Sequence, residues 1–125
     1  MKPKKHGIMR ILNAFKYSVD GFIVTLKSEE AFRQDVLIFL LFFFVAIFLP
    51  VNYIEKILLF SGLFLIILME LTNTALEFII NRISTKIHPL SKFTKDIGSC
   101  LVLISFIYTI LVWGIILWQN RFTIF

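Results

Sequence analysis

Two glutamates and two asparagines recur at helical spacing within an otherwise apolar stretch, residues 66–81. The four are Glu70, Asn73, Glu77 and Asn81. At about 100° per residue they fall within roughly 80° of one another and form one stripe, with Thr74 beside it. A carboxylate in hydrocarbon costs about 2.5–3.5 kcal/mol or more, so this face is expected to meet protein or water. Such carboxylates can bind Mg²⁺ or accept a proton from a hydroxyl group.

Two further polar clusters are expected at the same side of the membrane as Glu77. The segment SEEAFRQD, residues 28–35, contains Glu29, and HPLSKFTKDIGS, residues 88–99, contains Lys92, Lys95 and Asp96. Carboxylates hold Mg²⁺, Mg²⁺ bridges polyphosphate oxygens, and basic side chains neutralise the remaining charge. Glu70 lies about 10 Å from Glu77 along the helix, so the two are expected to differ in role. Together these groups predict phosphoryl transfer from a nucleotide to a lipid.

The composition excludes several classes of protein. The chain has 125 residues, of which 58% are apolar and gathered in blocks, which is too apolar for an ordinary soluble domain. Its single cysteine, Cys100, cannot form an intrachain disulfide, and His6 and His88 match no metal-ligand spacing. No glycine belongs to a P-loop or a Rossmann turn. The net charge is +5, and the basic residues flank the apolar blocks. This pattern is typical of the cytoplasmic loops of a membrane protein and argues against a nucleic-acid-binding surface.

The elements that must position these residues are predicted to be three transmembrane helices, over about 31–51, 57–80 and 97–118. Thirteen Lys and Arg residues divide as seven before the first span, one in the first loop, four in the second loop (81–96) and one in the tail. The positive-inside rule therefore places the N-terminus and the second loop in the cytosol and the C-terminus outside. The fold class is an all-α membrane protein with a single domain over residues 1–125.

Residues 7–27 form a predicted amphipathic helix that lies in the membrane interface. Apolar side chains recur there at helical spacing from Ile8 to Leu26, whereas Arg10, Lys16 and Asp20 lie mostly off that stripe. Packing on another protein is the alternative for this helix. Residues 1–6 form a basic tail that we expect to tether the chain to the membrane surface.

These motifs resemble the small integral-membrane diacylglycerol kinases of bacteria over about residues 7–118. The matching segments are GIMRILNAFKYSVDG (7–21), EEAFRQD (29–35), MELTNTALEFIINR (69–82) and HPLSKFTKDIGS (88–99). The end LVWGIILW (111–118) resembles the diacylglycerol branch more than the undecaprenol branch. The resemblance implies a homotrimeric helical bundle in the bacterial inner membrane, with composite sites between subunits. It also implies transfer of the γ-phosphate of Mg-ATP to diacylglycerol, giving phosphatidic acid.

The resemblance also implies roles for individual residues. Glu70 matches the general base, Glu29 and Glu77 match the pair that binds Mg²⁺, and Asn73 matches a supporting residue. The positions that match ATP contacts are Arg10, Tyr17, Glu29, Glu77, Lys86, His88, Lys95 and Asp96. The positions that match contacts to the lipid substrate are Arg10, Ala14, Ser18, Ala31, Phe32, Arg33, Gln34, Asp35, Glu70, Ser99, Trp113 and Trp118.

Three positions depart from the family pattern, and other functions stay open. Asn81 replaces the usual Asp, Glu30 is an additional acid, and Asp35 is one methylene shorter than the frequent Glu. The same chemistry on undecaprenol is the main alternative. A proton-coupled transporter would use Glu70 but leaves the gathering of Glu29, Glu77 and Lys95 unexplained. A buried polar interface between subunits, or a non-catalytic scaffold, would make the stripe purely structural.

Overall fold

The computed structural model describes residues 6–125, and all regular structure in that range is helical. The helices are α1 (Ile8–Ser28), α2 (Glu30–Phe48), α3 (Tyr53–Ile83), α4 (Pro89–Gln119) and the short α5 (Arg121–Ile124). The all-α prediction is therefore confirmed. Of the predicted basic tail, all but His6 lies outside the described residues.

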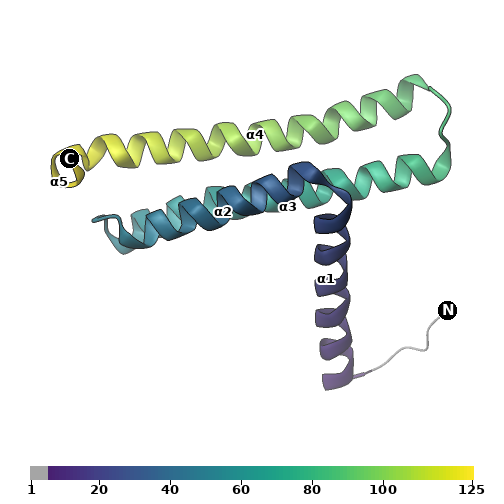
Figure 1. Cartoon of the computed structure of the whole chain (residues 1–125), viewed down its shortest axis with the longest axis horizontal. Coiled ribbons are helices and arrows are strands. Elements are labelled where there is room, and N and C mark those ends of the chain that lie inside the picture. Colours follow the sequence, from purple (N-terminus) through teal and green to yellow (C-terminus); the bar gives the residue numbers. More distant parts are fainter. Residues whose placement is uncertain (1–5) are drawn as a thin grey trace.

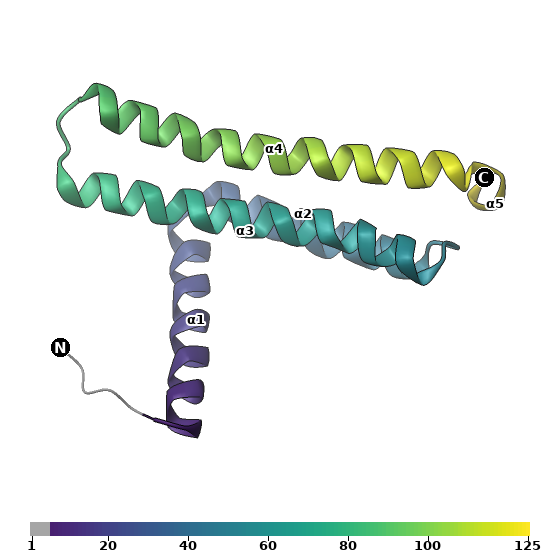
Figure 2. The ribbon, with the colours of Figure 1, turned by 180° about the vertical axis from the view of Figure 1, so that it is seen from behind.

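Helices α2, α3 and α4 run alongside one another, whereas α1 projects crosswise from the start of α2 (Figure 1). Figure 2 shows from behind that α3 and α4 both continue beyond the corner between α1 and α2. Helix α3 is central, because it packs against both α2 and α4. The 84–88 loop joins α3 to α4 at one end of this bundle, and the C-terminus lies at the other end.

Two helices, α2 and α4, are long and apolar enough to cross a membrane by length and composition. The remaining expected span, residues 57–80, falls within α3 (Tyr53–Ile83). Large apolar side chains cover the outer faces of the bundle, including Leu37, Leu40 and Phe44 on α2 and Ile104, Leu111 and Ile115 on α4. Such broad apolar exposure is typical of surfaces that meet lipid or another subunit.

The helices α3 and α4 begin at local capping signals. Asn52 and Glu55 form a capping box at the start of α3. His88 caps α4 by accepting a hydrogen bond at Nδ1 from the Leu90 amide at 3.0 Å, and Pro89 occupies the first turn. The helices extend into the segment predicted between the second and third spans, residues 81–96, and leave only residues 84–88 outside regular helix.

The bundle core lies toward the end of the bundle opposite the 84–88 loop. Its buried residues are Ala46, Leu59, Leu63, Trp113 and Ile116. Trp113 donates from Nε1 to the Leu59 carbonyl at 3.2 Å, which satisfies the polar atom of this buried ring. Gly62 lets α3 approach α4 closely, since a Cβ there would lie 3.0 Å from the Thr109 Cα. This packing holds α3 and α4 in register along their length.

Candidate active site

A cavity of about 200 Å³ lies where the corner between α1 and α2 meets α3 and α4. Its lining residues are Glu29, Ala31, Glu70, Asn73, Thr74, Glu77, Ser99 and Val102. We call it the acidic cavity. The structure therefore brings together the predicted base, both predicted metal-binding carboxylates and the supporting asparagine, although Glu29 is more than forty residues from the others in sequence.

Glu70 is the most enclosed carboxylate of the acidic cavity, with 9% of its surface exposed. The Asp35 carboxyl on α2 lies near it, and Glu29 and Glu77 line the same cavity. Asp35 is itself buried, and its Oδ2 has no hydrogen-bond partner within residues 6–125. The stripe on α3 thus faces acidic groups from α2 and from the corner. A buried acidic cluster of this kind needs protons, cations or polar ligands to compensate its charge.

Asn73 lies against the backbone of α4. A Cβ added at Gly98 would collide with the Asn73 Oδ1, so the glycine provides the space that the amide occupies. Oδ1 is buried and has no hydrogen-bond partner among the described residues. An unsatisfied buried acceptor costs about 1–3 kcal/mol, which favours a ligand or subunit group that can donate to it.

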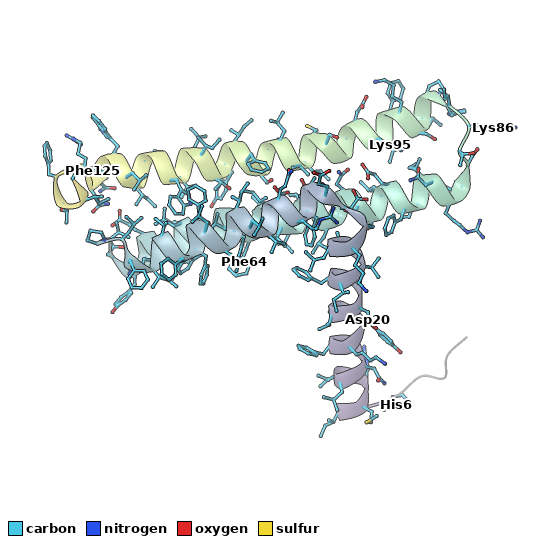
Figure 3. The ribbon with its side chains drawn as sticks, in the orientation of Figure 1. His6, Asp20, Phe64, Lys86, Lys95 and Phe125 are labelled. Atoms are coloured by element: carbon cyan, nitrogen blue, oxygen red, sulfur yellow. The ribbon has the colours of Figure 1, made fainter. Side chains whose placement is uncertain are left out.

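A second cavity, of about 290 Å³, lies at the end of the bundle formed by the 84–88 loop. We call it the loop cavity, and its lining residues are Ile80, Asn81, Ser84, Thr85, Lys86, Ile87, His88, Ser91, Lys92, Lys95 and Asp96. It contains four of the predicted nucleotide contacts: Lys86, His88, Lys95 and Asp96. Figure 3 shows the labelled Lys86 and Lys95 at this end of α3 and α4, away from Asp20 on α1. Three lysines and one carboxylate give the loop cavity a positive balance that suits a polyphosphate.

Lys92, Ser91 and Thr85 line the loop cavity but were absent from the predicted site. The Lys92 Nζ lies 2.6 Å from the Asp96 Oδ2 and forms an exposed i,i+4 ion pair. Lys92 already belongs to the polar cluster of residues 88–99 that the sequence shows, and this i,i+4 spacing to Asp96 is visible there too. Asn81, which ends the polar stripe, lines the loop cavity and not the acidic cavity. The stripe therefore divides between two cavities.

The predicted contacts on α1 do not join either cavity within one chain. Arg10, Ala14, Tyr17 and Ser18 are exposed on this projecting helix. The Ser18 hydroxyl donates to the Ala14 carbonyl of its own helix at 2.9 Å. Both cavities are lined by residues from Glu29 onward. Sites that include α1 would therefore need a different chain or a movement of α1.

The predicted lipid contacts separate into a group at the corner and a group on α4. At the corner, Ala31 lines the acidic cavity, Phe32 is fully buried, and Arg33 and Gln34 are exposed. Ser99 also lines the acidic cavity, but Trp118 lies about 28 Å farther along α4, at 1.5 Å per residue. Trp118 stacks with Arg121, whose Cζ is 4.2 Å from the ring centroid.

Trp113 lines a third cavity, an apolar groove between α2, α3 and α4. This groove of about 390 Å³ is lined by Ile38, Phe42, Leu63, Ile66, Phe106, Thr109, Ile110, Trp113 and Leu117. Phe42 meets Trp113 edge to face at 5.3 Å between ring centroids. The groove is almost entirely apolar, and its lining residues on α3, Ile66 and Leu63, lie about one and two turns from Glu70.

Within residues 6–125, no group of three or more His, Cys, Asp or Glu side chains is arranged to hold a metal by itself. Mg²⁺ does not need such a group, because one or two carboxylates together with substrate phosphates commonly bind it. Glu29 and Glu77 share the acidic cavity, and the Glu29 side chain forms no capping hydrogen bond at the start of α2. These two carboxylates therefore fit a hard cation that is shared with a nucleotide.

Comparisons with known proteins identify the family of the chain. The profile of a family described as prokaryotic diacylglycerol kinase matches residues 16–117. The chain is 38% identical to the diacylglycerol kinase of Escherichia coli K12 over 114 residues, which cover 91% of this chain and 93% of the relative. It is 39% identical to that of Pseudomonas aeruginosa, over 89% of this chain and 90% of the relative, and 37% identical to that of Helicobacter pylori, over 90% and 88%. The chain belongs to the prokaryotic diacylglycerol kinase family.

Proposed function

We propose that this membrane protein is a lipid kinase that transfers the γ-phosphate of ATP to the hydroxyl of diacylglycerol, giving phosphatidic acid and ADP. The observation that carries the proposal is the acidic cavity, where Glu29, Glu70 and Glu77 meet at the corner of the bundle. The basic loop cavity lies beyond it at the end of the same two helices. Acidic groups for the acceptor and the metal therefore adjoin basic groups for phosphates.

The position of the corner indicates where the membrane surface lies. Helix α2 has 19 residues and is about 28 Å long, close to the thickness of a bilayer core of about 30 Å. The crosswise α1 then lies in the cytosolic interface with its exposed Ile11, Leu12 and Phe15 in lipid. Helix α3, which contains the second predicted span, is about 46 Å long and extends about 18 Å beyond the corner. In this proposal the loop cavity lies on the cytosolic side of the inner membrane, where ATP is available.

Glu70 is the general base of the proposed reaction. A carboxylate that is enclosed near the membrane interface can meet the hydroxyl of a lipid that approaches from the bilayer. As the lipid oxygen bonds to the γ-phosphorus, its proton passes to Glu70 and the bond to the β-phosphate oxygen breaks, which leaves ADP. Positioned bases contribute about 10²–10⁴-fold in rate. Asn73 and Ser99 border the same cavity and provide polar groups that orient the acceptor.

Glu29 and Glu77 are the residues that would hold Mg²⁺ with the nucleotide. The bound cation supplies neutralisation of charge on the phosphate oxygens. On the protein side, Lys86, Lys95 and His88 of the loop cavity bind and orient the polyphosphate, and Asp96 is paired with Lys92. Glu77 of the acidic cavity lies one turn from Asn81 of the loop cavity, so the two cavities are neighbours along α3.

The proposed assembly is a homotrimer with sites shared between subunits. Arg10 and Tyr17 lie on α1 outside both cavities of their own chain. In a trimer they would instead contribute to a cavity of a neighbouring subunit. The broad apolar faces of α2 and α4 also exceed what one chain can bury. Subunit packing would cover part of these faces and shield the acidic cavity from lipid.

The test uses the purified full chain in micelles with labelled ATP and Mg²⁺. Diacylglycerol and undecaprenol are supplied separately at equal mole fraction, and the labelled lipid product is identified. We expect label in phosphatidic acid far faster than in undecaprenyl phosphate. Faster labelling of undecaprenol would replace the proposed acceptor, and label in neither lipid would refute lipid kinase activity.

A further inference from the structure

Only Glu29 separates α1 from α2. This residue is both the C-cap of α1 and the N-cap of α2, with an extended backbone at φ −120° and ψ 111°. Its amide donates to the Thr25 carbonyl at 2.9 Å, and its carbonyl accepts from the Arg33 amide at 3.2 Å. Its side chain lines the acidic cavity. The direction of the Glu29 carboxylate is therefore set by the angle between the two helices.

The Arg33 side chain fixes that corner. Its Nη1 donates to the Leu26 carbonyl at 2.7 Å and to the Lys27 carbonyl at 3.2 Å. The last carbonyls of a helix lack partners within it and carry partial negative charge, so a guanidinium there satisfies acceptors and interacts favourably with the helix dipole. Arg33 thus links the first turn of α2 to the last turn of α1 across Glu29.

A buried contact supports the corner from its inner side. The rings of Phe22 and Phe32 meet edge to face with centroids 5.1 Å apart, and Phe32 is fully buried. Thr25 is also buried and donates to the Gly21 carbonyl at 2.8 Å. The aromatic pair keeps the helices together, but an edge-to-face contact leaves rotation about it possible. The two Arg33 hydrogen bonds supply the directional constraint.

We propose that Arg33 is a positioning residue, which holds α1 against α2 so that the Glu29 carboxylate points into the acidic cavity toward Mg-ATP. This role rests on the proposed kinase activity, because it uses the assignment of Glu29 to the metal. It differs from the expectation that Arg33 contacts the lipid substrate, since the guanidinium already binds two carbonyls of α1. Groups that orient a metal ligand typically change metal affinity or activity about 10–100-fold when removed.

The test compares Arg33→Gln, Arg33→Lys and the control Lys27→Gln. Lys27→Gln removes a positive charge from the same corner and leaves the backbone carbonyl that Arg33 contacts. We expect Arg33→Gln to raise the Mg²⁺ concentration for half-maximal ATP binding and for half-maximal turnover by about tenfold. The KM for diacylglycerol should not change, and Arg33→Lys should be intermediate. Lys27→Gln should match the natural chain.

Hydrogen exchange provides a measurement that needs neither ligand nor activity. The Glu29 amide and the amides of residues 25–28 should exchange at least several-fold faster in Arg33→Gln, while amides in the middle of α3 stay unchanged. If Arg33→Gln does not fold, the same comparison uses Arg33→Lys, in which a single ammonium group replaces the guanidinium.

Unchanged exchange at the corner would overturn the proposal. So would faster exchange with an unchanged Mg²⁺ requirement, because Arg33 would then be structural only. A higher KM for diacylglycerol with an unchanged Mg²⁺ requirement would also overturn it and assign Arg33 to the lipid. If the natural chain phosphorylates no lipid, the proposed function fails separately, and exchange together with Mg²⁺-dependent ATP binding still decides the role of Arg33.

Discussion

At the residue scale, the acidic cavity depends on contacts that α3 makes with both α2 and α4. Asn73 occupies space that Gly98 leaves open, and Glu70 faces a second buried carboxyl, Asp35, from α2. Neither relation is visible as a motif, because the partners are 25 and 35 residues apart. Small changes at these contacts should therefore affect the chemistry more than the fold.

Gly98→Ala tests the contact with Asn73. The added methyl group would collide with Oδ1, which is the end of a side chain that can rotate away, so we expect a folded protein with a displaced amide. A displacement of about 1 Å near a reacting group can lower turnover by up to about 10²-fold. Gly114→Ala is the matched control, since among the described residues no atom outside its own stretch of helix lies within 4 Å of its added Cβ. Equal initial rates for the two variants would remove Asn73 from the site.

Glu77→Gln tests the assignment of the metal. An amide is a weak ligand for a hard cation, so this variant should bind Mg-ATP more weakly and regain part of its activity at high Mg²⁺. Glu30→Gln is the control, because Glu30 is exposed at the same corner and lines neither cavity. Activity is titrated against Mg²⁺ for both. Identical Mg²⁺ dependence would contradict a metal-binding role for Glu77.

At the element scale, the sequence predicted the helices well and their ends less well. Apolar blocks and helical periodicity located α1 to α4, because those patterns persist over many turns. Apolar blocks do not show where a helix ends, because α3 and α4 continue past these blocks and α4 begins at the His88 cap. The sequence also placed Glu70, Asn73 and Glu77 on one face. Residue spacing alone put Glu29 only on the same side of the membrane as Glu77, and the family resemblance paired the two. The separation of α1 from the loop cavity could not be predicted, because it depends on the corner.

Gly62→Ala tests the packing of α3 on α4. Its Cβ would meet both the side chain of Thr109 and the Thr109 Cα, which cannot rotate away, so the helices must separate. Overpacking typically costs about 1–3 kcal/mol, against a gain of up to about 1 kcal/mol from helix propensity. Thermal unfolding in detergent should therefore begin at a lower temperature, whereas Gly114→Ala should show no decrease. An unchanged unfolding temperature would show that α3 and α4 are less closely packed at Gly62 than the structure indicates.

At the scale of the whole molecule, the proposed reaction requires that the end of the bundle with the 84–88 loop faces the cytosol. Cysteines at Tyr53 and Ile87 test this, because both residues are highly exposed and they lie at opposite ends of α3 and α4. Tyr53 is chosen and not its neighbour Asn52, because replacing Asn52 would remove the side chain that caps α3. After replacement of the exposed Cys100, an impermeant thiol reagent should label position 53 from outside and position 87 only from the cytosol. The reverse labelling would place the loop cavity on the side without ATP.

The central claim is that the acidic cavity is the place of phosphoryl transfer and that Glu70 accepts the proton. Glu70→Gln preserves the shape of the side chain and removes the base. Because Glu29 and Glu77 are untouched, nucleotide binding should persist while the chemical step slows. Removal of a buried charge can also stabilise the fold, so loss of activity would not reflect unfolding.

The most direct measurement is therefore made on Glu70→Gln and the natural chain in the same diacylglycerol micelles. Mg-ATP binding and the initial rate of phosphatidic acid formation are recorded for both proteins. We predict unchanged binding and a fall in turnover of about 10²–10⁴-fold. Near-normal turnover in Glu70→Gln would contradict the account, because Glu70 would then be a structural residue and the base would lie elsewhere.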